Sequence, residues 1–175
     1  MIGSKAMHKK LVYISLIAIL FVWGCELEKV NYPPEPQIEY RSAITSISTN
    51  ALDQPVLYIK LTFYLIDGDG DVGLLWFDTL PPYDANFFPT LYGIENNILV
   101  MDTTLVATKY RIPYVGDLGQ DKALKAEVIV DLEYPPPYFP FPYDTILYSF
   151  YMNDRTLNKS NVAWTDTIIL SELSY

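Results

Sequence analysis

Three aspartates alternate with glycines in the segment Asp67-Gly-Asp-Gly-Asp71. Carboxylates at every second position of a glycine-rich loop can converge on one hard cation, and Ca²⁺ takes six to eight oxygen ligands at about 2.3–2.6 Å. If Asp67 is counted as the first position, Asp78 is the twelfth, where calcium loops commonly place a bidentate acid. We therefore predict a calcium site that contains Asp67, Asp69, Asp71 and Asp78.

The aspartate loop departs from the helix–loop–helix calcium motif, the EF-hand. Val72 stands at the sixth position, where that motif needs Gly, and Gly73 comes one residue later. No helical pattern flanks the loop, so an EF-hand is excluded but a looser Asp-rich calcium loop is not. The alternative is an acidic turn without a ligand, whose glycines supply positive φ angles.

Residues for catalysis are scarce in this sequence. His8 is the only histidine and Cys25 the only cysteine, so histidine-based triads and zinc sites lack their usual residues. A carboxylate pair for glycoside hydrolysis is conceivable but has no local motif here. We expect that the protein is not an enzyme.

The N-terminal residues have the pattern of a secretory signal. Lys5, Lys9 and Lys10 precede an uncharged apolar run over 11–22, and a basic start before a short apolar run is typical of such signals. The run is too short to cross a bilayer, which takes about 20 residues. We expect residues 1–24 to be a lipoprotein signal peptide, with a plain signal peptide or a short anchor helix as the alternatives.

The residues Val22-Trp23-Gly24-Cys25 resemble a lipobox, the cleavage site of bacterial lipoprotein signals. The resemblance implies that Cys25 becomes the N-terminus and carries a diacylglyceryl group and a further acyl chain such as palmitate. Trp23 is bulkier than the residue usual at its position. Several acyl chains give stable anchoring, so we expect a protein that Cys25 holds at a membrane of the bacterial envelope.

Residues 25–36 form the expected tether between this anchor and the domain. Its three prolines, Pro33, Pro34 and Pro36, exclude a helix and favour an extended chain. Two acidic residues just after Cys25 resemble the export signal of Bacteroidota lipoproteins, which implies an outer-membrane location that faces the cell surface.

Loss of the signal would make the chain strongly acidic. Three of the 12 basic residues lie in it and all 21 acidic residues lie outside it, so the mature net charge is 9 − 21 = −12. This charge argues against nucleic acid as a partner, since nucleic acid is bound by basic patches. It also disfavours electrostatic binding to anionic lipid.

The chain from residue 37 onward has the pattern of β-strands. Apolar and polar side chains alternate over 57–65, 124–132 and 146–152, which indicates strands with one buried face. We also expect a last strand at 162–170 and weaker strands at 38–48, 74–77, 90–94, 98–101 and 109–112. Seven to nine short strands over residues 37–175 predict an all-β fold, an immunoglobulin-like antiparallel β-sandwich.

Two resemblances agree with this fold. Residues 148–161 resemble the last hairpin of bacterial immunoglobulin-like domains, in which an Asp-x-x-x-Asn turn joins two strands. The chain from 25 to about 170 resembles small Bacteroidota surface lipoproteins of unknown function, through its lipobox, its Pro-Pro-Glu-Pro tether and its segment 67–74. The resemblance implies a location and a fold but no activity.

Loops gather at two ends of an immunoglobulin-like sandwich. One end would hold loops 67–73, 114–122 and 153–160, so that Asp117, Asp121 and Asp154 join the aspartate triplet where the tether enters. Asp154 is therefore a further candidate calcium ligand.

The opposite end would hold loops 81–89 and 135–143, which are rich in proline and aromatic rings. The rings either form a recognition surface or fold back and cap the core. The candidate ligand-binding residues are Tyr83, Phe87, Phe88, Tyr138, Phe139, Phe141 and Tyr143.

These patterns together predict a lipid-anchored, non-catalytic binding or adhesion module of the envelope, with calcium as a stabilising ion. Its partners would be the membrane, through the anchor, and a glycan or an envelope protein. The alternative is a structural accessory subunit of an envelope protein complex.

Overall fold

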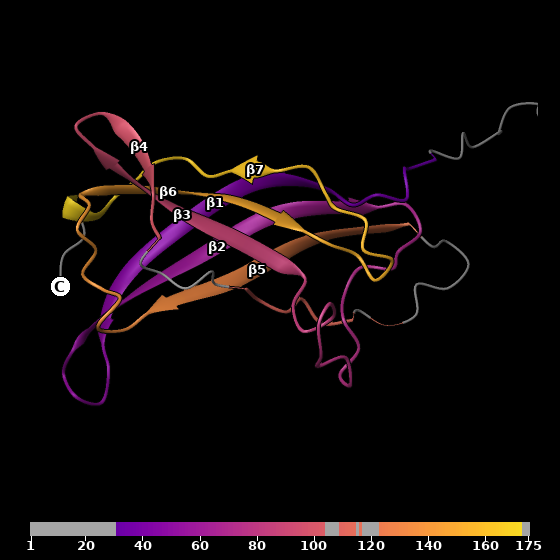
Figure 1. Cartoon of the computed structure of the whole chain (residues 1–175), viewed down its shortest axis with the longest axis horizontal. Coiled ribbons are helices and arrows are strands. Elements are labelled where there is room, and N and C mark those ends of the chain that lie inside the picture. Colours follow the sequence, from indigo (N-terminus) through magenta and orange to yellow (C-terminus); the bar gives the residue numbers. More distant parts are fainter. Residues whose placement is uncertain (1–30, 104–108, 115, 117–122, 173–175) are drawn as a thin grey trace, which may run out of the picture. The chain divides into compact units, whose positions relative to one another are not determined.

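The computed structural model describes residues 31–103, 109–114, 116 and 123–172. The predicted signal, Cys25, Asp117 and Asp121 lie outside these residues. Two antiparallel sheets form an all-β sandwich, as predicted (Figure 1). The only helix among the described residues is the short η1 (Leu170–Glu172), and none there is long and apolar enough to cross a membrane.

The first sheet contains β1 (Gln37–Thr49), β2 (Pro55–Asp67) and β5 (Leu124–Tyr134), in the order β1-β2-β5. The predicted alternation is confirmed in the central strand β2, because Leu57, Ile59, Leu61, Phe63 and Leu65 are all buried. Period-two burial is the geometry of a strand with one face on a core.

The second sheet contains five strands in the order β4-β3-β6-β7, with β8 also paired to β6. Their bounds are β3 (Phe87–Glu95), β4 (Ile98–Met101), β6 (Thr145–Met152), β7 (Ala163–Trp164) and β8 (Ile168–Ile169). A two-residue hairpin turn joins β3 to β4, and Asn96 and Asn97 take φ angles of 50° and 62° there. Two-residue hairpins favour such left-handed pairs, which Asn tolerates.

Three phenylalanines lie at the centre of the core between the two sheets. Phe63 of β2 stacks on Phe87 of β3 with ring centroids 5.3 Å apart, and Phe150 of β6 lies 5.4 Å from Phe63 and 5.7 Å from Phe87. Aromatic contacts of this kind add to the hydrophobic stabilisation of burial. The three rings thus join β2 of the first sheet to β3 and β6 of the second.

The order of strands in the two sheets is compatible with the predicted immunoglobulin-like sandwich. The first sheet corresponds to strands A, B and E of that fold, and the second to C′, C, F and G. Two weak strand predictions are wrong, since segments 74–77 and 109–112 form only isolated bridges, Leu74 to Pro113 and Phe87 to Tyr110. The predicted last strand is interrupted and appears as β7 and β8.

The loops gather at two ends of the sandwich (Figure 1). The tether end holds residues 32–33, 68–86, 109–114 and 153–160, which backbone hydrogen bonds connect: Gly68 to Pro33, Arg155 to Asp71, Asn153 to Asn86 and Tyr114 to Leu74. The hairpin end holds the β1–β2 turn, the β3–β4 turn and loop 135–144. The tether residues Tyr32 and Pro33 thus meet the domain beside the aspartate loop, as predicted.

One predicted loop position is wrong. Residues 81–89 lie at the tether end, because they lead into β3, whose first residue Phe87 pairs with Met152 at the end of β6. Each strand runs from one end of the sandwich to the other. The prediction of a strand at 74–77, which the structure does not contain, therefore assigned this loop to the wrong end. The two proline-rich aromatic loops therefore do not share a surface.

Candidate functional site

The aspartate loop follows β2 directly and depends on its glycines. Gly70 and Gly73 have φ angles of 67° and 95°, a region that suits glycine. At Gly68 a side chain would collide with the backbone carbonyls of Tyr32 and Pro33. The glycines are thus explained by backbone geometry alone, whereas the aspartates are not.

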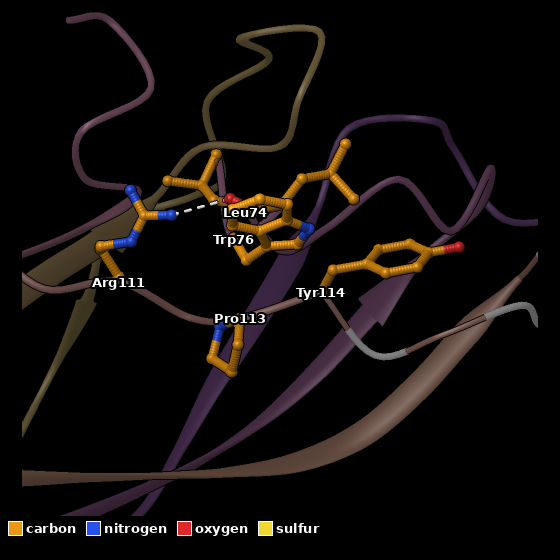
Figure 2. Close-up of a pocket in the computed structure, with 6 residues that line it drawn as sticks. Leu74, Trp76, Arg111, Pro113 and Tyr114 are labelled. Atoms are coloured by element: carbon orange, nitrogen blue, oxygen red, sulfur yellow. Dashed lines mark hydrogen bonds between the residues drawn. The ribbon is translucent and has the colours of Figure 1, made fainter. Parts of the chain in front are cut away.

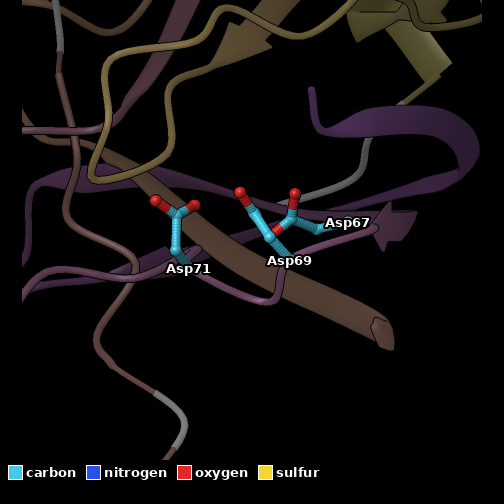
Figure 3. A group of neighbouring side chains, drawn as sticks. All are labelled: Asp67, Asp69 and Asp71. Carbon is cyan, nitrogen blue, oxygen red and sulfur yellow. The ribbon is translucent and has the colours of Figure 1, made fainter. Parts of the chain in front are cut away.

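The carboxylates of Asp67, Asp69 and Asp71 form one group. Each offers an oxygen, and these oxygens all lie within 4.8 Å of one another (Figure 3). Two oxygens on opposite sides of one calcium ion lie on the order of 4.6–5.2 Å apart, twice the usual bond length. The spacing is therefore compatible with three ligands of one ion.

Asp67 is the unusual member of this group. Its side chain is fully buried, and neither carboxylate oxygen accepts a regular hydrogen bond from any residue that the structure describes. Burial and the charges of Asp69 and Asp71 raise the pKa of Asp67 from 3.8 to about 6, and the backbone amides of Asp71 and Val72 offset part of that rise. A buried carboxylate that accepts no regular hydrogen bond is costly.

The neighbouring Asp71 is also perturbed. Burial raises its pKa, as do the charges of Asp154 and Asp69, while Thr156 and Arg155 act in the opposite direction. Its Oδ1 is buried and accepts no hydrogen bond from the described residues. The loop therefore concentrates negative charge where water is scarce.

Two further predicted ligands have other roles in the structure. The Asp78 carboxylate accepts the backbone amide of Leu75 at 3.0 Å. The Asp154 carboxylate is buried and accepts three hydrogen bonds, from the Asn158 amide at 2.7 Å, the Asn158 side chain at 2.8 Å and the Thr156 hydroxyl at 3.1 Å. The structure leaves both outside the group of three, and Asp154 instead closes the 154–158 turn.

The predicted aromatic recognition surface is wrong for its most buried members. Phe87 lies in the core and Phe139 is only 5% exposed, so neither ring can contact a ligand. Phe88 stacks on Tyr151 with ring centroids 5.0 Å apart. Tyr83 is half-buried beside Arg111, which donates to its carbonyl oxygen at 3.0 Å.

The rings of loop 135–143 cap the core at the hairpin end. Phe141 packs against Tyr134 and Phe139 with centroid distances of 5.2 and 6.0 Å. Tyr143 lies over Gly93, where a side chain would collide with its ring. Only Tyr138, which is 46% exposed, is open to solvent.

The most exposed aromatic residues were not among the predicted ones. Trp76 is 87% exposed and Phe77 58%, and the neighbouring aliphatic Leu80 is 76% exposed. The signal in the sequence was the run Leu74-Leu-Trp-Phe77, whose apolar residues do not alternate and so do not fit a strand with one buried face. We call Leu75–Leu80 the Trp76 loop.

Arg111 binds the backbone of the Trp76 loop. Its guanidinium donates to the carbonyl oxygens of Leu75 at 3.0 Å and Tyr83 at 3.0 Å, and also to that of Asp78. A cleft of about 340 Å³ lies beside it, lined by Leu74, Leu75, Trp76, Arg111, Pro113 and Tyr114. Figure 2 shows the Trp76 indole between Arg111 and Tyr114.

Comparison of the chain with protein-family models, with curated proteins and with solved structures finds no match.

Proposed function

We propose that this protein is a non-catalytic binding module, anchored by lipid on Cys25 in the bacterial envelope, whose aspartate loop binds calcium. The observation that carries the calcium proposal is the buried Asp67 carboxylate, which has no regular hydrogen bond from the described residues and lies beside two further carboxylates. A divalent cation would neutralise this charge and occupy its oxygens. The anchor rests on the basic N-terminus, the apolar run and the Gly24-Cys25 pair of the sequence.

Calcium fits the three carboxylates better than a smaller cation does. Ca²⁺ accepts an irregular set of six to eight oxygens, whereas Mg²⁺ demands near-octahedral geometry at about 2.0–2.1 Å. The loop supplies three carboxylates of unequal burial, since Asp67 is buried, Asp71 half-buried and Asp69 exposed. Water and backbone carbonyls would complete the shell.

The test is thermal unfolding with and without calcium. A ligand that binds only the native state stabilises it, so calcium at a hundred times its dissociation constant should raise the Tm by roughly 5–10 °C. Asp69→Asn should remove this shift, because it deletes a ligand that is exposed and hardly contributes to the fold.

The matched control is Asp131→Asn, an exposed aspartate on β5. This variant should keep the full calcium shift. Absence of any shift in the parent protein would show that the aspartate loop is an acidic turn only. Magnesium should give a smaller shift than calcium at the same concentration.

The anchor has its own test. Mass measurement of the N-terminal peptide from protein expressed in a bacterium should show Cys25 as the first residue, with acyl chains attached. Cys25→Ala should release the protein from the membrane fraction. An unmodified Cys25 would overturn the anchor and leave the calcium proposal intact.

A structural accessory subunit is the second candidate, and the edge strand β4 favours it. Ile98, Leu99 and Met101 of this short strand are exposed, and among the strands that the structure describes β4 pairs with β3 alone. An open strand edge with apolar side chains can pair with a strand of another protein. Crosslinking on cells that recovers one stoichiometric protein partner would support this role, and binding to isolated glycans would support the adhesion role.

A further inference from the structure

The Trp76 loop presents an apolar surface to solvent at the tether end. Trp76 and Phe77 contact each other edge to face, with ring centroids 5.5 Å apart, and both are exposed, as is Leu80. The partly exposed Tyr114 lines the same cleft as Trp76. Adjacent exposed aromatic and aliphatic side chains are unusual on a monomer and mark a contact surface.

The exposure of these side chains is fixed by the backbone behind them. Arg111 binds carbonyl oxygens in the loop and just after it, and Lys109 forms an ion pair with Asp84, four residues beyond the loop. The Leu74 amide donates to Ile112 at 2.9 Å, and the Tyr114 amide donates to Leu74 at 3.1 Å. These bonds therefore fix the backbone that carries the exposed rings.

The tether meets the domain at the same end. The Gly68 amide donates to Pro33 at 2.9 Å, and the Lys125 ammonium lies 4.4 Å from the centre of the Tyr32 ring. Cys25 precedes Pro33 by eight residues, which span at most about 28 Å when fully extended. A lipid on Cys25 would hold the tether end within this distance of the bilayer.

We propose that the Trp76 loop contacts the surface of the bilayer that carries the Cys25 lipid. This inference rests on the proposed anchor and adds a second contact to it, made by Trp76, Phe77 and Leu80. Tryptophan and tyrosine favour the interface between acyl chains and headgroups. Phenylalanine and leucine gain from removal of apolar surface from water.

Space favours the bilayer as the occupant, and charge restricts the kind of lipid. A folded partner of 100 residues is on the order of 30 Å across, so the tether leaves little room for one between this end and the membrane. Asp67, Asp69, Asp71 and Asp154 lie at the same end and repel anionic headgroups. The contact is therefore apolar, and it suits zwitterionic lipid.

Tryptophan quenching tests the contact. Removal of the signal also removes Trp23, so the chain that begins at Cys25 has two tryptophans, Trp76 and Trp164. Trp164→Phe leaves Trp76 as the only reporter, and Trp76→Phe leaves Trp164 as the matched control. Trp164 lies on β7 opposite Ser149, in the middle of β6.

The lipidated protein would be placed in phosphatidylcholine vesicles with and without brominated acyl chains. Brominated lipid should quench the emission of Trp76 by about twofold or more, because interfacial indoles lie near the acyl chains, and the emission should shift to the blue. Trp164 should be unaffected. Equal emission of Trp76 in both kinds of vesicle would overturn the inference.

The sole cysteine separates this inference from the anchor. If Cys25 proves to be unmodified in cells, the same chain can be coupled through its thiol to a maleimide lipid in the vesicle. Quenching of Trp76 in the coupled protein would support the contact even where the natural anchor fails. No quenching in coupled protein that floats with the vesicles would overturn the contact and leave the anchor untouched.

Discussion

Two loops of similar composition differ in this sandwich in the exposure of their aromatic rings. The loop at the hairpin end, 135–143, and the region 74–83 at the tether end are both rich in proline and aromatic residues. In the first, Phe139 is 5% exposed, and in the second, Trp76 is 87% exposed. Composition alone therefore does not decide whether aromatic rings cover the core or face outward.

The difference lies in what each loop covers. The hairpin-end loop lies over the end of β5 and packs its rings on Tyr134 and on one another. In the Trp76 loop, Arg111 binds backbone carbonyl oxygens, and the rings of Trp76 and Phe77 are exposed. The rings of the hairpin-end loop thus pack on apolar side chains, whereas the Trp76 loop has the guanidinium of Arg111 beside it.

Phe139→Ala should cause the largest effect in this comparison. The ring is buried among Phe141 and the core, so its loss should lower the free energy of unfolding by about 3–5 kcal/mol. Urea unfolding measures this value. Tyr138→Ala is the control in the same loop and should cost within about 0.5 kcal/mol; an equal loss at both positions would break the contrast between cap and surface.

Arg111→Met should have the next largest effect. It removes hydrogen bonds from a charged donor to the backbone of the Trp76 loop and should cost about 1–2 kcal/mol, since these bonds are partly solvated. The amides of Asp78 and Tyr83, which donate to the loop residues Leu75 and Leu80, should exchange hydrogen faster. Arg111→Lys keeps the charge but not the forked geometry, so unchanged exchange in both variants would show that the guanidinium does not hold the loop.

Most of the fold could be predicted from the sequence because its long strands have one buried face. Alternation over β2, β5 and β6 is strict enough to identify each strand. The prediction of strands at 74–77 and 109–112 is wrong because these tether-end segments are apolar but form only single bridges. One miscounted strand then reversed the end assigned to loop 81–89, because every strand changes the end of the sandwich.

The candidate site could be predicted only where it is local in sequence. Asp67, Asp69 and Asp71 are brought together by their own loop, so their spacing was sufficient. The roles of Asp78 and Asp154 depend on amides that fold around them, and the backbone of the Trp76 loop is bound by Arg111, which is distant in sequence. Such long-range contacts leave no periodic pattern in the sequence.

The pH dependence of stability separates the aspartate loop from ordinary acidic turns. Asp67 has a pKa of about 6 in the folded chain and an ordinary value near 3.8 when unfolded. Between about pH 4 and 6 the Asp67 carboxyl is ionised in the unfolded chain but still protonated in the folded chain. Asp67 therefore lowers the free energy of unfolding as the pH rises from about 4 to 6, and this loss of stability persists above pH 6.

Asp67→Asn removes this ionisation. In the presence of a chelator at pH 7, this variant should melt on the order of 2–4 °C above the parent, and the advantage should vanish near pH 4. Asp131→Asn should follow the parent throughout. With saturating calcium the order should reverse, because the parent gains the ion and Asp67→Asn does not; a variant less stable than the parent even in chelator would show that the Asp67 charge is satisfied without a cation.

Trp76→Ala should have the smallest effect on stability in solution. The indole contacts little except Phe77 and solvent, so the free energy of unfolding should change by less than about 0.5 kcal/mol. This value is to be compared with the loss at Phe139, measured under the same conditions. The two substitutions together measure the contrast between the loops. A ring that caps the core should stabilise the fold, whereas the exposed Trp76 ring should contribute little to stability and is available for the proposed membrane contact. A Trp76→Ala loss close to that of Phe139→Ala would mean that the Trp76 loop covers part of the core, and it would remove the basis for a membrane contact at the tether end.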